Sequence, residues 1–170
     1  MSQYILNSAN KLINKYKTRD PFSLIKSLGI ELMFDASFSK LKGFYTLMNR
    51  QAYIVINSNL TEEKMRIVAA HELGHHILHR NFAKKKILQE FELYDMTATT
   101  EYEANCFAAE LLICDEEIIG HINSGYDMNQ IAALLNTDIN LVGIKLGNLN
   151  SSGKKYNIGI NPKGDFLGNM

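Results

Sequence analysis

Apolar side chains along this chain recur with two different spacings, which together predict a mainly helical protein with one small sheet. Over most of the chain they fall three or four positions apart, as on the buried side of an amphipathic helix. Between residues 30 and 56, β-branched and aromatic residues instead form short runs separated by turn-forming residues. The predicted helices span about residues 2–17, 21–28, 62–80, 101–113, 116–122, 128–135 and 139–148, and the predicted strands span 30–34, 43–48 and 52–56. We therefore expect an α+β fold in one domain, residues 1–170.

The helix expected at 62–80 has the clearest local signals. Thr61 is a suitable N-cap, and Glu62 and Glu63 occupy the first turn, where the helix dipole favours negative charge. Gly74 is the one glycine within it and costs about 1 kcal/mol in helix propensity relative to alanine. We expect another element to approach the helix closely at Gly74, since that would explain a residue without a side chain.

The same helix carries the sequence His71-Glu72-Leu73-Gly74-His75. Residues four apart lie nearly above one another on a helix, so the two imidazoles point at one place. Glu72 lies beside that place, where a carboxylate can take a proton from metal-bound water. The alternative is a solvated polar helix face. The motif favours a zinc site with His71 and His75 as ligands and Glu72 as the catalytic base.

A catalytic zinc needs a third protein ligand, with the fourth position left for water. The extended motif HExxHxxGxxH would require glycine at 78 and histidine at 81, but this chain has Leu78 and Asn81. His76 and His79 fall elsewhere on the helix, and we interpret them as surface residues or as supports for the ligands. The third ligand must therefore come from another part of the chain.

The acidic helix that follows, capped by Thr99 or Thr100, supplies the candidates. Glu101 and Asn105 share one face at a spacing of four, so a carboxylate ligand and an amide that holds a ligand histidine would lie together. Ala104 keeps that face small enough for close helix approach. We prefer Glu101 over Glu103 as the third ligand, although the sequence leaves both open.

Two ordered motifs resemble the ImmA/IrrE family of metallo-endopeptidases: A-A-H-E-L-G-H-H-I-L-H at 69–79 and E-Y-E-A-N-C-F-A-A-E-L-L at 101–112. Upstream, D-P-F at 20–22, L-G-I at 28–30, G-F-Y and I-V-I-N are also similar to the family. The resemblance covers most of residues 20–150. It implies a zincin-like core that precedes a C-terminal helical element.

The resemblance also implies roles for individual residues. His71, His75 and Glu101 correspond to the ligands of a gluzincin-like zinc site, and Glu72 to its catalytic base. The implied substrate is a helix-turn-helix transcriptional repressor of a mobile element or stress regulon. One departure concerns the end of the second motif, where the family usually has a proline and this chain has Ile-Cys at 113–114.

A peptidase also needs a donor for the oxyanion that develops on the substrate carbonyl. Tyr45, Tyr94 and Tyr102 are candidates, and the sequence does not choose between them. Tyr94 lies in the stretch 81–97, whose basic run at 84–86 we interpret as part of a solvated connection and not as a docking surface.

Composition excludes several other classes. The chain has 18 basic and 18 acidic residues, so no net field attracts nucleic acid or an anionic membrane. We find neither a signal peptide nor an apolar run long enough to span a bilayer. Cys106 and Cys114, too far apart on or near one helix for a disulfide, fit reduced thiols. We expect a cytoplasmic protein.

Residues 128–147 read like a helix-turn-helix, which raises a second functional class. Its second helix carries a single cation, Lys145, so few phosphate contacts are available and direct DNA binding is not expected. The alternative function is a non-proteolytic regulatory protein that binds a repressor or DNA through this element.

Overall fold

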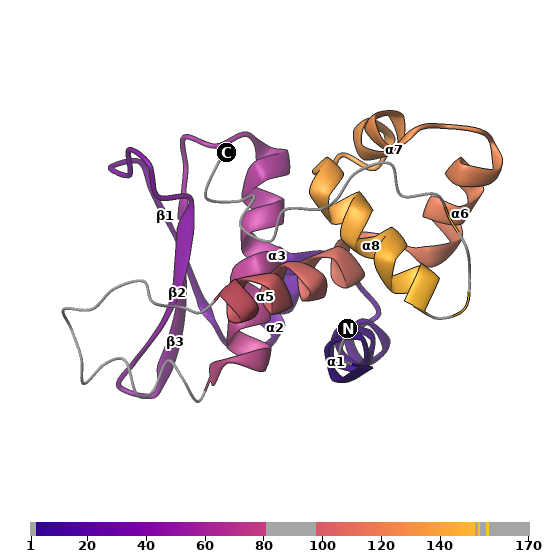
Figure 1. Cartoon of the computed structure of the whole chain (residues 1–170). Helices are drawn as coiled ribbons and strands as arrows, with labels where there is room; N and C mark the ends of the chain where they lie inside the picture. The colour runs from indigo at the N-terminus through magenta and orange to yellow at the C-terminus, as the bar shows by residue number, and fades with distance from the viewer. Residues whose placement is uncertain (1–2, 81–97, 152, 154–155, 157–170) are drawn as a thin grey trace.

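The computed structural model describes residues 3–80, 98–151, 153 and 156, and it shows a mainly helical α+β fold (Figure 1). The helices are α1 (Gln3–Tyr16), α2 (Pro21–Ser27), α3 (Glu62–Leu78), α5 (Ala98–Leu112), α6 (Asp115–Asn123), α7 (Met128–Leu134) and α8 (Ile139–Ser151). The strands are β1 (Glu31–Asp35), β2 (Gly43–Met48) and β3 (Gln51–Asn57). The expectation of a mainly helical α+β fold with one small sheet is confirmed. The stretch 81–97, with its basic run, lies outside the described residues.

The three strands form one sheet in the order β1-β3-β2. β1 runs parallel to β3, and β2 and β3 form an antiparallel hairpin. Its two-residue turn places Asn49 at φ 50° and Arg50 at φ 70°, the left-handed conformation that matches the twist of a tight hairpin. Because β2 lies at one end of the strand order, it is an edge strand.

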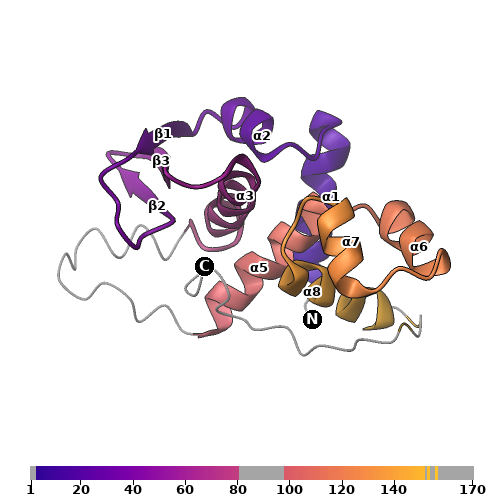
Figure 2. The same ribbon diagram turned by 90° about the horizontal axis from the view of Figure 1, so that it is seen from above.

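The elements stack in the order sheet, α3, α5, and then α1 and α8, which differs from their order in the chain (Figure 1, Figure 2). α3 packs against β2 and β3 on one side and against α5 on the other, and α5 in turn contacts α1 and α8. A single cluster of buried apolar side chains includes residues from all seven of the described helices and from β2 and β3. α3 and α5 thus lie between the sheet and the helices α1 and α8.

The start of α3 agrees with its local sequence, whereas the start of α5 does not. Thr61 caps α3, since its hydroxyl accepts a hydrogen bond from the backbone N–H of Lys64 at 3.3 Å. Thr99 and Thr100, expected to cap the next helix, instead lie inside α5, so that prediction is wrong. The first N–H groups of a helix need no intrahelical acceptor, which makes threonine tolerable in its first turn.

Two glycines allow close packing around α3. A Cβ added at Gly74 would lie 3.2 Å from both Cα and O of Ala104, which confirms the expected close approach of another element. A Cβ at Gly43 would lie 2.6 Å from Cγ1 of Val68, so β2 also packs tightly on α3. These contacts set the HExxH segment between an edge strand and a second helix.

At the end of α5, where the resemblance stated above would place a proline, the chain continues through Ile113 and Cys114. Arg19 donates hydrogen bonds to the carbonyl oxygens of Glu110, at 2.8 Å, and of Leu111, at 3.1 Å. A guanidinium at the C-terminal end of a helix satisfies free carbonyls and complements the dipole. The backbone of Cys114 then begins α6, and both cysteines are free thiols, as expected.

The helices α7 and α8 are joined by a short turn in which Asn136 has φ 45°. Lys145 of α8, considered above as the cation available to DNA, is only 1% exposed. Its ammonium lies 2.6 Å from a carboxylate oxygen of Glu110 and 2.5 Å from one of Asp115. The one cation of this helix is therefore not available to a phosphate, because its charge is buried between α5 and α6.

Candidate metal centre

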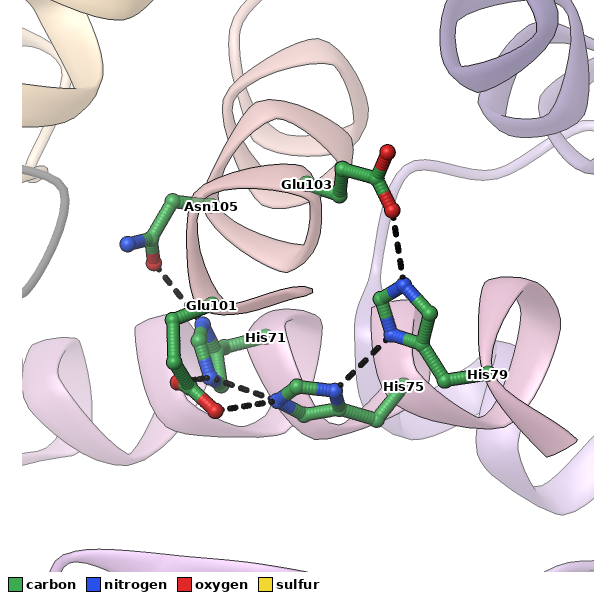
Figure 3. Close-up of polar contacts among 6 residues, drawn as sticks. All are labelled: His71, His75, His79, Glu101, Glu103 and Asn105. Carbon is green, nitrogen blue, oxygen red and sulfur yellow. Dashed lines mark hydrogen bonds and ion pairs between the residues drawn. The ribbon is translucent and has the colours of Figure 1, made fainter. Parts of the chain in front are cut away.

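Three donor atoms converge between α3 and α5 (Figure 3). Nε2 of His71 lies 3.0 Å from Nε2 of His75, because the two rings stand one helical turn apart. Glu101 of α5 reaches both rings, with its carboxylate oxygens 3.1 Å from Nε2 of His71 and 3.4 Å from Nε2 of His75. Among the residues that the structure describes, this is the one group of histidine, cysteine and acidic side chains close enough to hold a metal ion.

The spacing of these donors fits a tetrahedral metal. Ligands at zinc distances of about 2.0–2.2 Å lie about 3.4 Å from one another in a tetrahedral arrangement. The two ring nitrogens are 3.0 Å apart, and each lies 3.1 or 3.4 Å from one of the two carboxylate oxygens of Glu101, so these separations are close to that value. Two imidazoles and one carboxylate are also the donor types that zinc accepts in catalytic sites. The residues present therefore fit a bound zinc ion.

The electrostatics of the group also favour a positive charge at this point. Burial lowers the pKa of His75 to about 4, so this ring is neutral at pH 7 and able to act as a ligand. Burial disfavours the charge of Glu101, but hydrogen bonds with His71 and His75 hold its pKa well below the usual range. His71 is also buried, yet the hydrogen bond to Glu101 and the charge of Glu72 raise its pKa. A carboxylate that stabilises a proton on His71 would equally stabilise a metal cation at this point.

Glu72 lies beside the three donors without joining them. Its side chain is buried, and this burial raises its pKa to about 7. The backbone N–H of Tyr45 on β2 donates a hydrogen bond to its carboxylate, so the edge strand reaches the same place. A carboxylate with a pKa near the working pH is suited to accept and return a proton.

The other sequence candidates have different partners. Asn105 lies where the amide was expected, with Oδ1 2.8 Å from Nδ1 of His71. Glu103 is directed away from the donors, and its carboxylate lies 2.9 Å from Nε2 of His79. His76 lies 3.2 Å from the hydroxyl of Tyr45. His76 and His79 are 7% and 6% exposed, so neither is a surface residue.

Two of the three tyrosines considered as oxyanion donors have other partners in the structure. The hydroxyl of Tyr45 is engaged by His76, and that of Tyr102 interacts with the thiol of Cys106. Tyr94 lies outside the described residues. Sequence reasoning missed the contact between His75 and His79, for which their spacing of four was a signal. It also missed the contact between Glu103 and His79, which no sequence pattern signalled.

An HExxH helix packed against a small sheet, with a glutamate supplied by the next long helix, is the arrangement of a metallopeptidase. The chain belongs to the peptidase M78 family, whose model, described as the IrrE N-terminal-like domain, matches residues 25–146. The family resemblance stated from the motifs is thereby confirmed. Membership in a metallopeptidase family implies a bound metal ion and a protein substrate.

Two relatives are similar over long stretches. The chain is 34% identical over 142 residues to the "Uncharacterized immunity region protein 2" of Bacillus phage phi105, across 81% of this chain and 86% of that protein. It is 33% identical over 104 residues to "Metallopeptidase ImmA" of Bacillus subtilis strain 168, which covers 59% of each chain. Within the described part of the chain, no helix has the length and apolar character needed to cross a membrane.

Proposed function

We propose that this protein is a zinc-dependent endopeptidase with a zincin-like core in a single domain, 1–170. The observation that carries the proposal is the convergence of His71, His75 and Glu101 beside the buried carboxylate of Glu72. Three protein ligands leave one position open on a tetrahedral metal, as hydrolysis requires. The single apolar cluster shared by the N-terminal and C-terminal helices supports one domain.

The residues divide the chemical work between them. His71, His75 and Glu101 would hold zinc, which when bound supplies Lewis acidity toward water and toward the peptide carbonyl. The Glu72 carboxylate accepts a proton from the attacking water and later delivers it to the leaving amine nitrogen. The burial that raises its pKa to about 7 equips it for both transfers.

The edge strand β2 offers a place for the substrate backbone. It lies at one end of the strand order, and the backbone N–H of Tyr45 points at Glu72. An extended peptide laid along such an edge forms main-chain hydrogen bonds that do not depend on its sequence. This arrangement supports cleavage within a chain, since nothing in it requires a free terminus.

The proposed substrate is a helix-turn-helix transcriptional repressor of a mobile element or stress regulon. Support comes from the resemblance to the ImmA/IrrE family and from the phage relative, whose name places it in an immunity region. Such a repressor acts on DNA inside the cell, so the proposal includes a cytoplasmic location and an anti-repressor role.

The test is to incubate the purified protein with the repressor encoded beside its gene. We expect discrete fragments, no fragments when a zinc chelator is present, and recovery of cleavage when zinc is returned. Mass spectrometry of the fragments would identify the scissile bond. Cleavage that persists in chelator would contradict a metal-dependent mechanism, and intact repressor with the zinc-loaded protein would contradict the substrate.

The alternative is a regulatory protein that binds a repressor or DNA through residues 128–147 without cutting. The buried position of Lys145 argues against the DNA form of this alternative, because the cation on the presumed recognition helix is already paired. Repressor that co-purifies with the zinc-loaded protein and stays uncut would favour the other form.

A further inference from the structure

Two further side chains, those of His79 and Glu103, are linked in sequence to the ligand histidine His75 by polar contacts (Figure 3). Nδ1 of His75 lies 3.1 Å from Nδ1 of His79, one turn further along the helix. Nε2 of His79 lies 2.9 Å from a carboxylate oxygen of Glu103 on α5. We propose that His79 and Glu103 are positioning residues that orient His75 and set its tautomer for metal binding. This inference rests on the proposed zinc site.

The direction of each hydrogen bond follows from the chemistry of its partners. A carboxylate accepts hydrogen bonds only, so Nε2–H of His79 donates to Glu103. In a neutral imidazole the other nitrogen is then an acceptor, and Nδ1 of His79 accepts from Nδ1–H of His75. The proton of His75 is thereby held on Nδ1, which leaves the Nε2 lone pair directed at Glu101 and His71.

His79 and Glu103 orient the ring of His75 as Asn105 orients the ring of His71. Oδ1 of Asn105 lies 2.8 Å from Nδ1 of His71, which places the proton of that ring on Nδ1 as well. Both ligand rings are therefore oriented from α5, one directly and the other through His79. Partners of this kind hold a ligand ring in place and increase the basicity of its donor nitrogen.

Burial of the His79 ring favours its role in orienting His75. His79 is 6% exposed, so its nitrogens have little access to water and depend on protein partners. The side chain of Glu103 is 35% exposed, so the last member of this series of contacts is a carboxylate that solvent can stabilise. Glu103 thus has a definite role although it does not face the three donors.

The experiment measures zinc affinity by competition with a chromophoric chelator, for wild type, Glu103→Ala, His79→Phe and the double variant. We expect each single variant to bind zinc about 10- to 100-fold more weakly. Because Glu103 acts through His79, adding Glu103→Ala to His79→Phe should change the affinity by less than about twofold. A direct effect of the Glu103 charge on the metal would persist in the double variant. That result would overturn the proposal that Glu103 acts through His79.

A second readout separates positioning from a general loss of stability. The visible absorption of the Co²⁺-substituted protein reports the ligand geometry, so its bands should shift in Glu103→Ala and His79→Phe. His121→Phe and Glu117→Ala, which change a histidine and a glutamate of α6, are the matched controls and should leave spectrum and affinity unchanged. Glu103 is partly exposed, so its variant remains informative even if His79→Phe unfolds.

The outcomes distinguish this inference from the function on which it rests. Wild type that binds zinc, together with an affinity and a Co²⁺ spectrum unchanged in Glu103→Ala, would overturn the positioning role alone. Wild type that binds no zinc would overturn the proposed function, and the positioning role with it.

Discussion

Gly74 and Ala104 touch where α3 crosses α5, and a Cβ added at Gly74 would lie 3.2 Å from the Cα and the carbonyl oxygen of Ala104. Gly74 directly precedes His75, and Ala104 lies between Glu103 and Asn105. The same contact therefore brings the face of α5 that carries Glu101 and Asn105 up to the two histidines. Gly74 and Ala104, which take no part in the reaction, thus set the distance between α3 and α5 at the site.

The first prediction concerns this contact. Gly74→Ala should lower the free energy of unfolding by about 1–3 kcal/mol, because two of the three atoms that the new Cβ meets belong to backbone and cannot rotate away. Gly120→Ala is the matched control, since nothing lies within 4 Å of its added Cβ, and it should stabilise the protein by up to about 1 kcal/mol. Urea unfolding of both variants gives the comparison. Equal stabilisation by the two substitutions would show that the crossing tolerates a larger separation.

The second prediction concerns the metal. The purified protein should carry about one zinc per chain, measured by mass spectrometry of the native protein or by elemental analysis. Glu101→Ala should lose most of this zinc because it removes one of three donors. Glu103→Ala should still carry one zinc at saturating concentration, since its carboxylate contacts His79 and not the metal position. The opposite pattern would mean that Glu103 is the ligand.

The third prediction separates metal binding from catalysis. Glu72→Gln should keep the fold and the zinc, because Glu72 is not among the three donors. Proteolysis of the repressor should fall by about 10²-fold or more, since glutamine cannot accept the proton. Rates measured with zinc-saturated protein exclude an effect through metal loss. A near wild-type rate would exclude Glu72 as the base.

The fourth prediction concerns the buried ion pair. Lys145→Ala should lower the free energy of unfolding by about 3–5 kcal/mol, because it leaves the Glu110 carboxylate, 6% exposed, without its cation. Lys11→Ala on the exposed side of α1 is the control and should change stability by less than about 0.5 kcal/mol. Equal free energies of unfolding for the two variants would mean that Lys145 does not support the fold as its contacts indicate.

The fifth prediction concerns DNA. The protein should show no sequence-preferring affinity for DNA at physiological salt, because the cation of α8 is buried and the chain has no net charge. Gel-shift titrations at increasing salt, with operator and unrelated duplexes of equal length, provide the measurement. A salt-resistant shift specific to the operator would make DNA binding a primary activity and overturn the ranking of functions.

Local physics made several parts of this protein readable from sequence alone. The spacing of His71 and His75, the cap at Thr61 and the turn at Asn49 and Arg50 all depend on residues within about four positions of one another. Backbone hydrogen bonds in helices and tight turns are equally short in range, so sequence patterns report them directly. The family resemblance rests on the same segments and is confirmed by the family model.

The tertiary structure alone decided which side chains meet across helices. Glu101 and Glu103 are two residues apart and chemically alike, and the angle at which α5 crosses α3 directs one to the histidine pair and the other to His79. Lys145 reads as a surface cation in the sequence, yet packing of α8 buries it against Glu110. These outcomes depend on contacts between residues far apart in the chain, such as Gly74 with Ala104, whose energies no local pattern contains.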